Sequence, residues 1–175
     1  MIQGSARSAP DPIRRENLSK RDSYTRLFGE FGAALSDTDW IALANDSLPP
    51  NLSALNTRIV AGSRTDRFLQ FSYKPGPDSY TFISLSGGCV AEMLDQTAAH
   101  CGTFVTSYGC PTLTVTANYL RAGKGSTFVA TARLLTATSA SAVIAAELTD
   151  ERERLIASAS VVVQLLKDIT RYKRS

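Results

Sequence analysis

The stretch LSGGCVAEMLDQTAAH, residues 85–100, places two adjacent glycines in front of an apolar segment with helical periodicity. We predict a helix over residues 86–106, with Ser86 as its N-cap and both Gly87 and Gly88 in its first turn. The N–H groups of a first helical turn have no partners within the helix, and the helix dipole makes them attractive to an anion or a polarised carbonyl oxygen. Glycine lets a ligand approach this backbone closely, as an oxyanion hole requires. The alternative explanation is tight packing of the glycines under a crossing strand.

The predicted helix is apolar over most of its circumference, and its polar side chains form one narrow stripe. Such a helix is expected to lie within a curved sheet, with the stripe against polar groups or against another subunit. Asp95 lies on this stripe, where it is either a functional carboxylate or one that is merely solvated or paired. The apolar sector contains Met93, Leu94, Ala98, Cys101, Phe104 and Val105, and the stripe contains Glu92, Asp95, Gln96, Ala99 and Thr103.

The chain before this helix changes its pattern twice. Residues 1–20 are polar, charged and broken by prolines, and we expect a mobile leader there. A helical pattern begins at Asp22, and a second short helix is predicted with Asp37 as its N-cap and an end at Pro49-Pro50. Residues 57–63 and 67–73 are predicted as two strands joined by a turn.

The chain after this helix alternates between apolar and polar residues with the period of a strand. Strands are predicted over residues 112–119, 126–135, 140–149 and 154–166, separated by turn signals and with no helix between them. This order predicts an α+β fold in which an antiparallel sheet of about six strands wraps the long helix.

The composition is that of a soluble, single-domain protein. Of the 175 residues, 43% are hydrophobic and 20% are charged, and a net charge of +3 gives no reason to expect nucleic acid or a membrane as a partner. No apolar run resembles a signal peptide or a membrane span, so we expect a cytoplasmic protein. The three cysteines form no C-x-x-C pair and are expected to be free thiols. We find no metal-ligand cluster, phosphate loop or dinucleotide fingerprint, so no metal or cofactor is expected.

Two motifs give the sequence a resemblance to a known family. Ser86-Gly87-Gly88 opens the predicted helix, Asp95 follows nine residues after Ser86, and the next strand reads TLTVTANYLR, from Thr112 to Arg121. Over residues 57–166 the chain resembles the hotdog-fold acyl-CoA thioesterases of the phenylacetate-degradation, PaaI-like type. The resemblance implies a hotdog thioesterase-like domain over residues 51–168, after the leader (1–20) and a helical extension (21–50) and before a basic tail (169–175).

The resemblance also implies an activity, the hydrolysis of an acyl- or aryl-CoA thioester to the free acid and CoA by a homodimer or homotetramer. The Gly87 N–H would polarise the thioester carbonyl, and Asp95, reaching across a dimer interface, would act as general base or nucleophile. The Thr112 hydroxyl would orient the water, although a row of strand threonines gives it a purely structural alternative. The implied substrate-binding residues are Ser86, Gly88, Arg121 and Lys124, the last two as point charges for the CoA phosphates.

Three positions depart from the family pattern. Ser86 stands where the family has a histidine, Tyr80 stands where it often has Asn or Gln, and the turn at residues 120–126 is one residue shorter and lacks a proline. The missing histidine motivates an alternative function, a non-hydrolytic protein that binds acyl-CoA or acyl-carrier thioesters. Asp95 argues against this alternative, because a desolvated carboxylate beside an anionic ligand does not help a pure binder. A hotdog dehydratase is a weaker alternative, since such enzymes pair an acid with a histidine and this chain has no such pair at a suitable spacing.

Several other residues have both a structural and a functional interpretation. His100, the single histidine, is expected to be packed or hydrogen-bonded on a different side of the helix from Asp95. Glu92 is expected at a surface or an interface, or as a neighbour that shifts the pKa of Asp95. Cys89 is an alternative nucleophile, although it has no histidine beside it. The helices before residue 50 either cover a face of the oligomer or close the pocket. Aromatic residues expected either in a substrate pocket or in the core are Phe68, Phe71, Tyr73, Tyr80, Phe82 and Tyr108.

Overall fold

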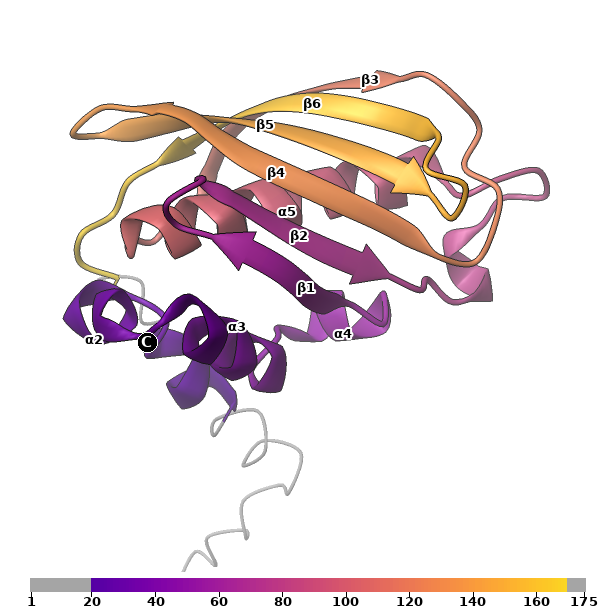
Figure 1. Cartoon of the computed structure of the whole chain (residues 1–175). Coiled ribbons are helices and arrows are strands. Elements are labelled where there is room, and N and C mark those ends of the chain that lie inside the picture. Colours follow the sequence, from indigo (N-terminus) through magenta and orange to yellow (C-terminus); the bar gives the residue numbers. More distant parts are fainter. Residues whose placement is uncertain (1–19, 170–175) are drawn as a thin grey trace, which may run out of the picture.

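A six-stranded antiparallel sheet forms the body of the protein, and one long helix, α5 (Gly87–Thr106), lies along its inner face (Figure 1). The computed structural model describes residues 20–169, so the predicted leader up to residue 19 and the predicted tail beyond residue 169 lie outside the described residues. The strand order is β1-β2-β4-β5-β6-β3. The strands are β1 (Arg58–Ser63), β2 (Phe68–Tyr73), β3 (Thr112–Tyr119), β4 (Phe128–Ala137), β5 (Ser141–Asp150) and β6 (Leu155–Gln164).

The predicted α+β class is confirmed, and each strand begins and ends within two residues of its predicted bounds. The reason is the polarity of α5, which packs mainly on β2, β4 and β5. Its apolar sector fills the inner face of the sheet. Of its polar stripe, Thr103 is buried, and the half-buried members are Glu92, Asp95, Gln96 and Ala99. The residues of this sector that have no exposed surface are Met93, Leu94, Ala98, Cys101 and Phe104, whereas Val105 is half-buried.

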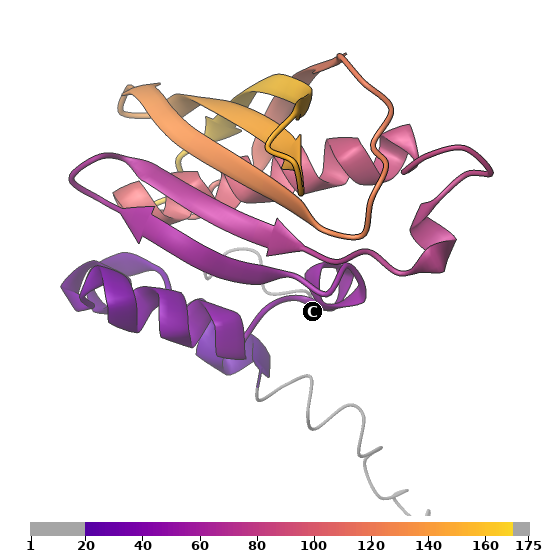
Figure 2. The same ribbon diagram turned by 45° about the vertical axis from the view of Figure 1, so that its right-hand side comes forward.

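The two edges of the sheet differ in what covers them. Helix α3 (Asp37–Asp46) packs against the edge strand β1 and runs beneath it in Figure 2. At the other edge, no described segment covers β3, and Leu113, Val115 and Tyr119 are exposed by 56%, 38% and 55%. An open edge strand with exposed apolar side chains is a template for pairing with another chain.

The single helix expected from Asp22 is broken in the structure. Residues 20–25 are helical, residues 26–28 are not, and α2 (Gly29–Ala34) then follows. Gly29, the first residue of α2, has a φ of 65°, a left-handed conformation that interrupts the regular helix between the two segments. The periodicity of the apolar residues continues across the break, and this is why the sequence pattern predicted one helix.

The predicted N-cap of α3 is wrong by one residue. The side chain of Ser36, not that of Asp37, accepts the N–H of Asp39, at 3.1 Å. Asp37 is instead paired with Arg64, which lies 27 residues further along the chain and is invisible to a local pattern. The second helix ends before Pro49 and Pro50, as expected, whereas the short helix α4 (Pro50–Ala54), which begins at Pro50, was not predicted.

Arg64, in the turn between β1 and β2, fastens the N-terminal helices to the end of α5. Its Nε donates to the carbonyl of Phe104 at 2.8 Å, and its Nη2 donates to the carbonyl of Gly32 at 3.0 Å. Its Nη1 donates both to the carbonyl of Leu35 at 2.7 Å and to Asp37 Oδ1 at 2.9 Å. One planar guanidinium thus satisfies acceptors from three segments, a geometry that only arginine provides.

We predict that Arg64→Lys destabilises the protein by about 2–4 kcal/mol, because a lysine ammonium cannot reach this fork of acceptors and leaves carbonyls unpaired. Urea unfolding followed by circular dichroism measures the effect. Arg152→Lys is the matched control, since the Arg152 side chain is exposed and its replacement is expected to change stability by less than about 0.5 kcal/mol. Equal stability of the two variants would contradict the role of Arg64.

Over residues 20–169, no helix combines the length and the apolar character that a membrane crossing requires. The same part of the chain brings together no group of three His, Cys, Asp or Glu side chains able to hold a metal ion. Cys89, Cys101 and Cys110 are free thiols. Burial raises the pKa of the Cys101 thiol to about 12 and also raises that of Cys110, so these two thiols stay protonated at neutral pH.

Candidate active site

The first turn of α5 presents backbone donors at the surface. Ser86 caps the helix, because its Oγ accepts the N–H of Cys89 at 3.3 Å, and the predicted N-cap is confirmed. The N–H groups of Gly87 and Gly88 have no acceptor within residues 20–169, and both glycines are exposed. These two donors remain available to a ligand.

The space around the glycines decides between the two explanations of the pair. A Cβ atom on Gly88 would meet nothing within 4 Å, and one on Gly87 would lie 3.7 Å from the ring of Tyr119, an ordinary contact. Packing within this chain therefore does not require glycine at either position. The space in front of both glycines leaves room for a group from outside the chain to approach the backbone closely.

A hollow of about 400 Å³ opens beside this first turn. One wall is Tyr119, at the end of β3, whose hydroxyl donates to the carbonyl of Gly87 at 3.1 Å. Arg121 also lines the hollow and donates to the carbonyl of Leu155 at 2.7 Å, while Lys124 is exposed in the turn that follows. The sequence pattern identifies Tyr119 only as a strand residue, because nothing local indicates that the end of β3 meets the start of α5.

Asp95 and Thr112, both predicted as catalytic, lie together. The hydroxyl of Thr112, the first residue of β3, donates to Asp95 Oδ1 at 2.7 Å. Asp95 is half-buried on α5, and its Oδ2 has no hydrogen-bond partner among the described residues. The carboxylate is therefore held by one oxygen and keeps the other free to accept a proton.

The predicted catalytic groups of a single chain cannot act on the same carbonyl. Gly87 and Asp95 are eight residues apart on α5, which separates them by about 12 Å along the helix axis. A carbonyl oxygen within about 3 Å of the Gly87 N–H is beyond the reach of the same chain's Asp95. The two groups can meet at one thioester only if they come from different copies of the chain.

The remainder of the polar stripe is partly covered by the N-terminal extension, which in the structure runs from residue 20 to the end of α4 at Ala54. Asn51 of α4 donates from Nδ2 to Glu92 Oε1 at 3.1 Å, which places Glu92 at a contact between helices. Gln96 and Ala99 border a cavity of about 350 Å³ beneath the first helical segment. The extension thus covers part of the helix stripe as well as the edge of the sheet.

His100 is a packed, hydrogen-bonded residue, as predicted. Its Nδ1 lies 2.8 Å from the carbonyl of Gln96, so Nδ1 carries the proton and donates. Its Nε2, 3.3 Å from the Tyr24 hydroxyl, then accepts from it. Burial is the largest influence on this group and lowers the pKa of His100, which keeps the imidazole neutral at pH 7.

The six aromatic residues do not form one pocket. Phe71 and Tyr73 are fully buried in the core, where the Tyr73 hydroxyl donates to the carbonyl of Met93 at 3.1 Å. Phe82 is fully exposed, beside Ile83, at the tip of the loop between β2 and α5. The half-buried members are Phe68, Tyr80 and Tyr108.

Residues 84–157 match the model of the Thioesterase superfamily, a stretch that runs from just before α5 into β6. The resemblance to the hotdog-fold thioesterases is confirmed. The match includes the glycine pair, Asp95 and Thr112. No curated protein sequence matches the chain.

Solved structures of hotdog thioesterases share the fold at low sequence identity. A phenylacetic acid degradation-related protein from Ralstonia eutropha JMP134 is 21% identical, with a TM-score of 0.64 over 67% of this chain and 91% of its own. The PaaI protein from the phenylacetic acid degradation operon of E. coli is 17% identical, with a TM-score of 0.66 over 74% of this chain and 94% of its own. A hypothetical thioesterase protein from Streptococcus pneumoniae TIGR4, solved with coenzyme A, is 19% identical, with a TM-score of 0.60 over 65% of this chain and 89% of its own.

We predict that the stability of the protein falls as the pH drops below about 6.5, the ordinary pKa of histidine. The pKa of His100 is lower in the folded protein than in the unfolded chain, so the unfolded chain takes up a proton that the folded protein does not. Unfolding free energies measured in urea at a series of pH values test this. His100→Gln is expected to be less stable at pH 8 but to lose less stability on acidification. An equal loss in both proteins would contradict the assignment.

Proposed function

We propose that this protein hydrolyses acyl- or aryl-CoA thioesters at sites formed between two copies of the chain. The observation that carries the proposal is the arrangement on α5, with unpaired Gly87 donors at its start and the Asp95–Thr112 pair about 12 Å further along. The match to the Thioesterase superfamily supports the reaction class. The coenzyme A bound to the similar protein from Streptococcus pneumoniae supports the leaving group.

The chemistry follows from these groups. The Gly87 N–H of one copy donates to the thioester carbonyl oxygen, and Asp95 of the other copy accepts a proton from the water that attacks the carbonyl carbon. The Gly87 N–H then stabilises the oxyanion of the tetrahedral intermediate. When the C–S bond breaks, the CoA sulfur takes the proton from Asp95, and the products are the free acid and CoA. Direct attack by Asp95 would instead form an anhydride that water hydrolyses, with the same products.

Thr112 sets the orientation of the carboxylate in this mechanism. Its hydroxyl engages Oδ1 of Asp95 at 2.7 Å and leaves Oδ2 for the water. Arg121 lines the hollow beside Gly87, and Lys124 follows in the next turn. Both side chains are exposed cations that suit the phosphates of CoA. Gly88 and Ser86 complete the turn against which the thioester would lie.

The open edge of the sheet supports the second copy. β3 carries Thr112 at its first residue and Tyr119 at its last, so pairing of two β3 strands brings both ends of the proposed site close to the interface. Edge pairing would also remove the exposed apolar side chains of Leu113 and Val115 from water. We therefore propose a homodimer with two equivalent sites, which a further pairing of dimers would extend to a tetramer.

Ser86 supplies the one observation that favours the alternative function, the binding of a thioester without hydrolysis. The Ser86 Oγ is engaged as the helix cap by the Cys89 N–H, so it replaces neither the shape nor the proton chemistry of the family's histidine. A protein that binds acyl-CoA or an acyl-carrier thioester without hydrolysing it is consistent with this contact. Binding without turnover in the experiments below would establish this second function.

We predict that Asp95→Asn lowers kcat for CoA thioesters by at least about 100-fold, because the amide keeps the size of the side chain but cannot accept the proton. Release of the CoA thiol from a panel of acyl- and aryl-CoA esters measures this. Glu92→Gln, on the same stripe, is the matched control and is expected to keep kcat within about threefold. Unchanged turnover in Asp95→Asn, with the oligomer intact, would contradict the role of Asp95.

We predict that Gly87→Pro lowers kcat by about 100- to 1,000-fold, because proline removes the one N–H that polarises the carbonyl. Proline is tolerated at the first position of a helix, and Ser86 before it already has the extended conformation (φ −66°, ψ 145°) that proline favours. Gly87→Ala separates loss of the donor from crowding of the substrate, because it keeps the N–H while its Cβ, which meets only an ordinary contact within this chain, points at the approaching thioester. We expect it to raise KM but to lose much less kcat than Gly87→Pro. Similar kcat values for the two variants would exclude this N–H from the reaction.

A further inference from the structure

The cavity of about 350 Å³ under the N-terminal extension is lined by sequence neighbours of the Asp95–Thr112 pair. Its wall includes Gln96, the residue that follows Asp95, and Pro111, the residue that precedes Thr112. Both elements that hold the pair therefore continue into the cavity. Its apolar and aromatic lining comes from Tyr24, Phe28, Ala99, Cys110, Leu166 and Ile169, and its polar lining from Arg21, Thr25, His100 and Thr103.

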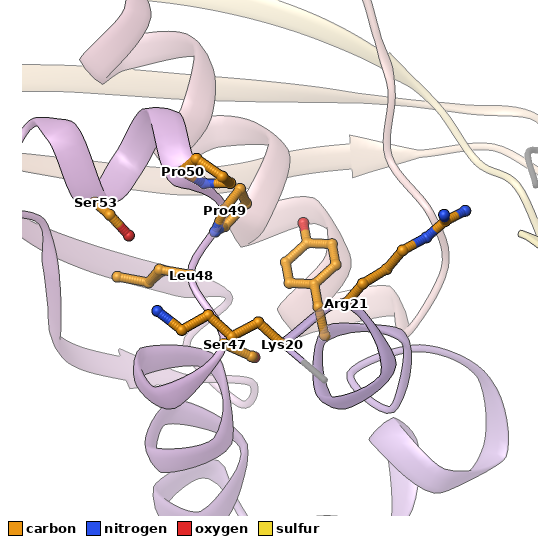
Figure 3. A pocket seen from close by; sticks show the side chains of 8 residues that line it. Lys20, Arg21, Ser47, Leu48, Pro49, Pro50 and Ser53 are labelled. Carbon is orange, nitrogen blue, oxygen red and sulfur yellow. The ribbon is translucent and has the colours of Figure 1, made fainter. Parts of the chain in front are cut away.

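A second cavity, of about 530 Å³, lies on the other side of the first helical segment (Figure 3). Leu48, Pro49 and Pro50 form its apolar wall, and the side chain of Lys20 runs alongside Leu48. Tyr24 and Arg21 line both cavities, so the first helical segment separates them. Each cavity is within the size range of small-molecule sites in proteins.

Tyr24, which borders both cavities, is held in place by a hydrogen bond and by two ring contacts. Its hydroxyl donates to His100 Nε2 at 3.3 Å, and its ring packs edge-on against Phe28, with centroids 5.4 Å apart, and against His100, at 6.0 Å. Burial raises the pKa of Tyr24 to about 12, so the phenol is neutral and remains a donor at neutral pH. The side chain thus forms one fixed, uncharged wall of the first cavity.

We propose that the cavity beside the Asp95–Thr112 pair receives the acyl group of the thioester, and that Tyr24 limits its length. The inference rests on the proposed function, because the thioester carbonyl must lie beside Asp95 to react. The anionic CoA portion then belongs in the hollow next to Arg121 of the copy that supplies Gly87, and the apolar acyl group belongs in the mostly apolar cavity along α5 of the copy that supplies Asp95. The substrate class is therefore a medium-length aliphatic or an aryl acyl-CoA, with long chains excluded by the Tyr24 ring.

Two substitutions, at residues other than Asp95 and Thr112, change the cavity in opposite directions. Ala99→Phe fills the first cavity, and we expect kcat/KM for octanoyl-CoA and phenylacetyl-CoA to fall by about tenfold or more while acetyl-CoA stays within about twofold. Tyr24→Ala joins the two cavities, and we expect the preferred chain length to move from octanoyl-CoA towards lauroyl- and palmitoyl-CoA. Tyr24→Phe is the control for Tyr24→Ala, because it loses only the hydroxyl and is expected to keep the wild-type preference.

Ser53→Phe tests the path between the cavities. Ser53 is exposed on α4 and lines only the second cavity, so this change is expected to leave the wild-type profile unaltered. Added to Tyr24→Ala, it is expected to abolish the gain in long-chain activity. An unchanged chain-length profile in both Ala99→Phe and Tyr24→Ala, or an equal loss for acetyl-CoA and octanoyl-CoA, would overturn the proposal. Should Ala99→Phe not fold, Ala99→Leu makes the same test with a smaller side chain.

A binding measurement keeps this proposal distinct from the proposed function. Calorimetry with non-hydrolysable acyl-CoA thioethers of increasing chain length reports on the cavity in the absence of turnover. If wild type hydrolyses no ester but its affinity rises with chain length and this rise is lost in Ala99→Phe, the acyl site stands and hydrolysis is refuted. If wild type hydrolyses esters with a profile and affinities that neither variant alters, hydrolysis stands and the acyl site is refuted.

Discussion

Burial of α5 against the sheet is the constraint on which the rest of the structure depends. The helix fills the inner face of the strands with side chains such as Met93, Leu94 and Phe104, which have no exposed surface. Only its first turn and its polar stripe are left for other interactions, and the proposed chemistry uses both of them. Because the two features lie about 12 Å apart on a rigid helix, one chain cannot bring them together at a single carbonyl. The geometry of one helix thus makes the proposed site a property of two copies.

The N-terminal extension makes the two edges of the sheet different, because it covers only one of them in the described part of the chain. It covers the β1 edge through α3, and Arg64 fastens it to the end of α5 through backbone carbonyls that would otherwise be unpaired. The β3 edge, which carries Thr112 and Tyr119, is left without a cover in the described part of the chain. The same extension closes the space beside Asp95 with Tyr24. This segment therefore leaves the β3 edge open for the proposed pairing, and it also lines the cavity proposed for the acyl group.

Periodicity and turn signals predicted the strands and α5 well, because these elements have one buried and one exposed side and so leave a local pattern in the sequence. Ser86 as a cap, and the spacing from Ser86 to Asp95, were equally local. The break at Gly29, the cap at Ser36 and the pairing of Asp37 with Arg64 were not predictable in this way, since each depends on contacts between distant segments. The same holds for the candidate site: Asp95 and Thr112 were identified singly, but the contacts of Tyr119 with Gly87 and of Tyr24 with His100 arise only from the folded topology.

The shared site is the central claim, and mixed dimers test it most directly. Asp95→Asn chains lack the base and Gly87→Pro chains lack the oxyanion donor, so each homodimer is expected to be inactive. If the site takes Asp95 from one copy and Gly87 from the other, a mixed dimer has one site with both groups intact and one with neither. An equal mixture, exchanged to equilibrium, is then expected to recover about a quarter of wild-type activity, because half of the dimers are mixed and each has one working site. A mixture that remains as inactive as either parent, although subunit exchange is demonstrated, would contradict the account.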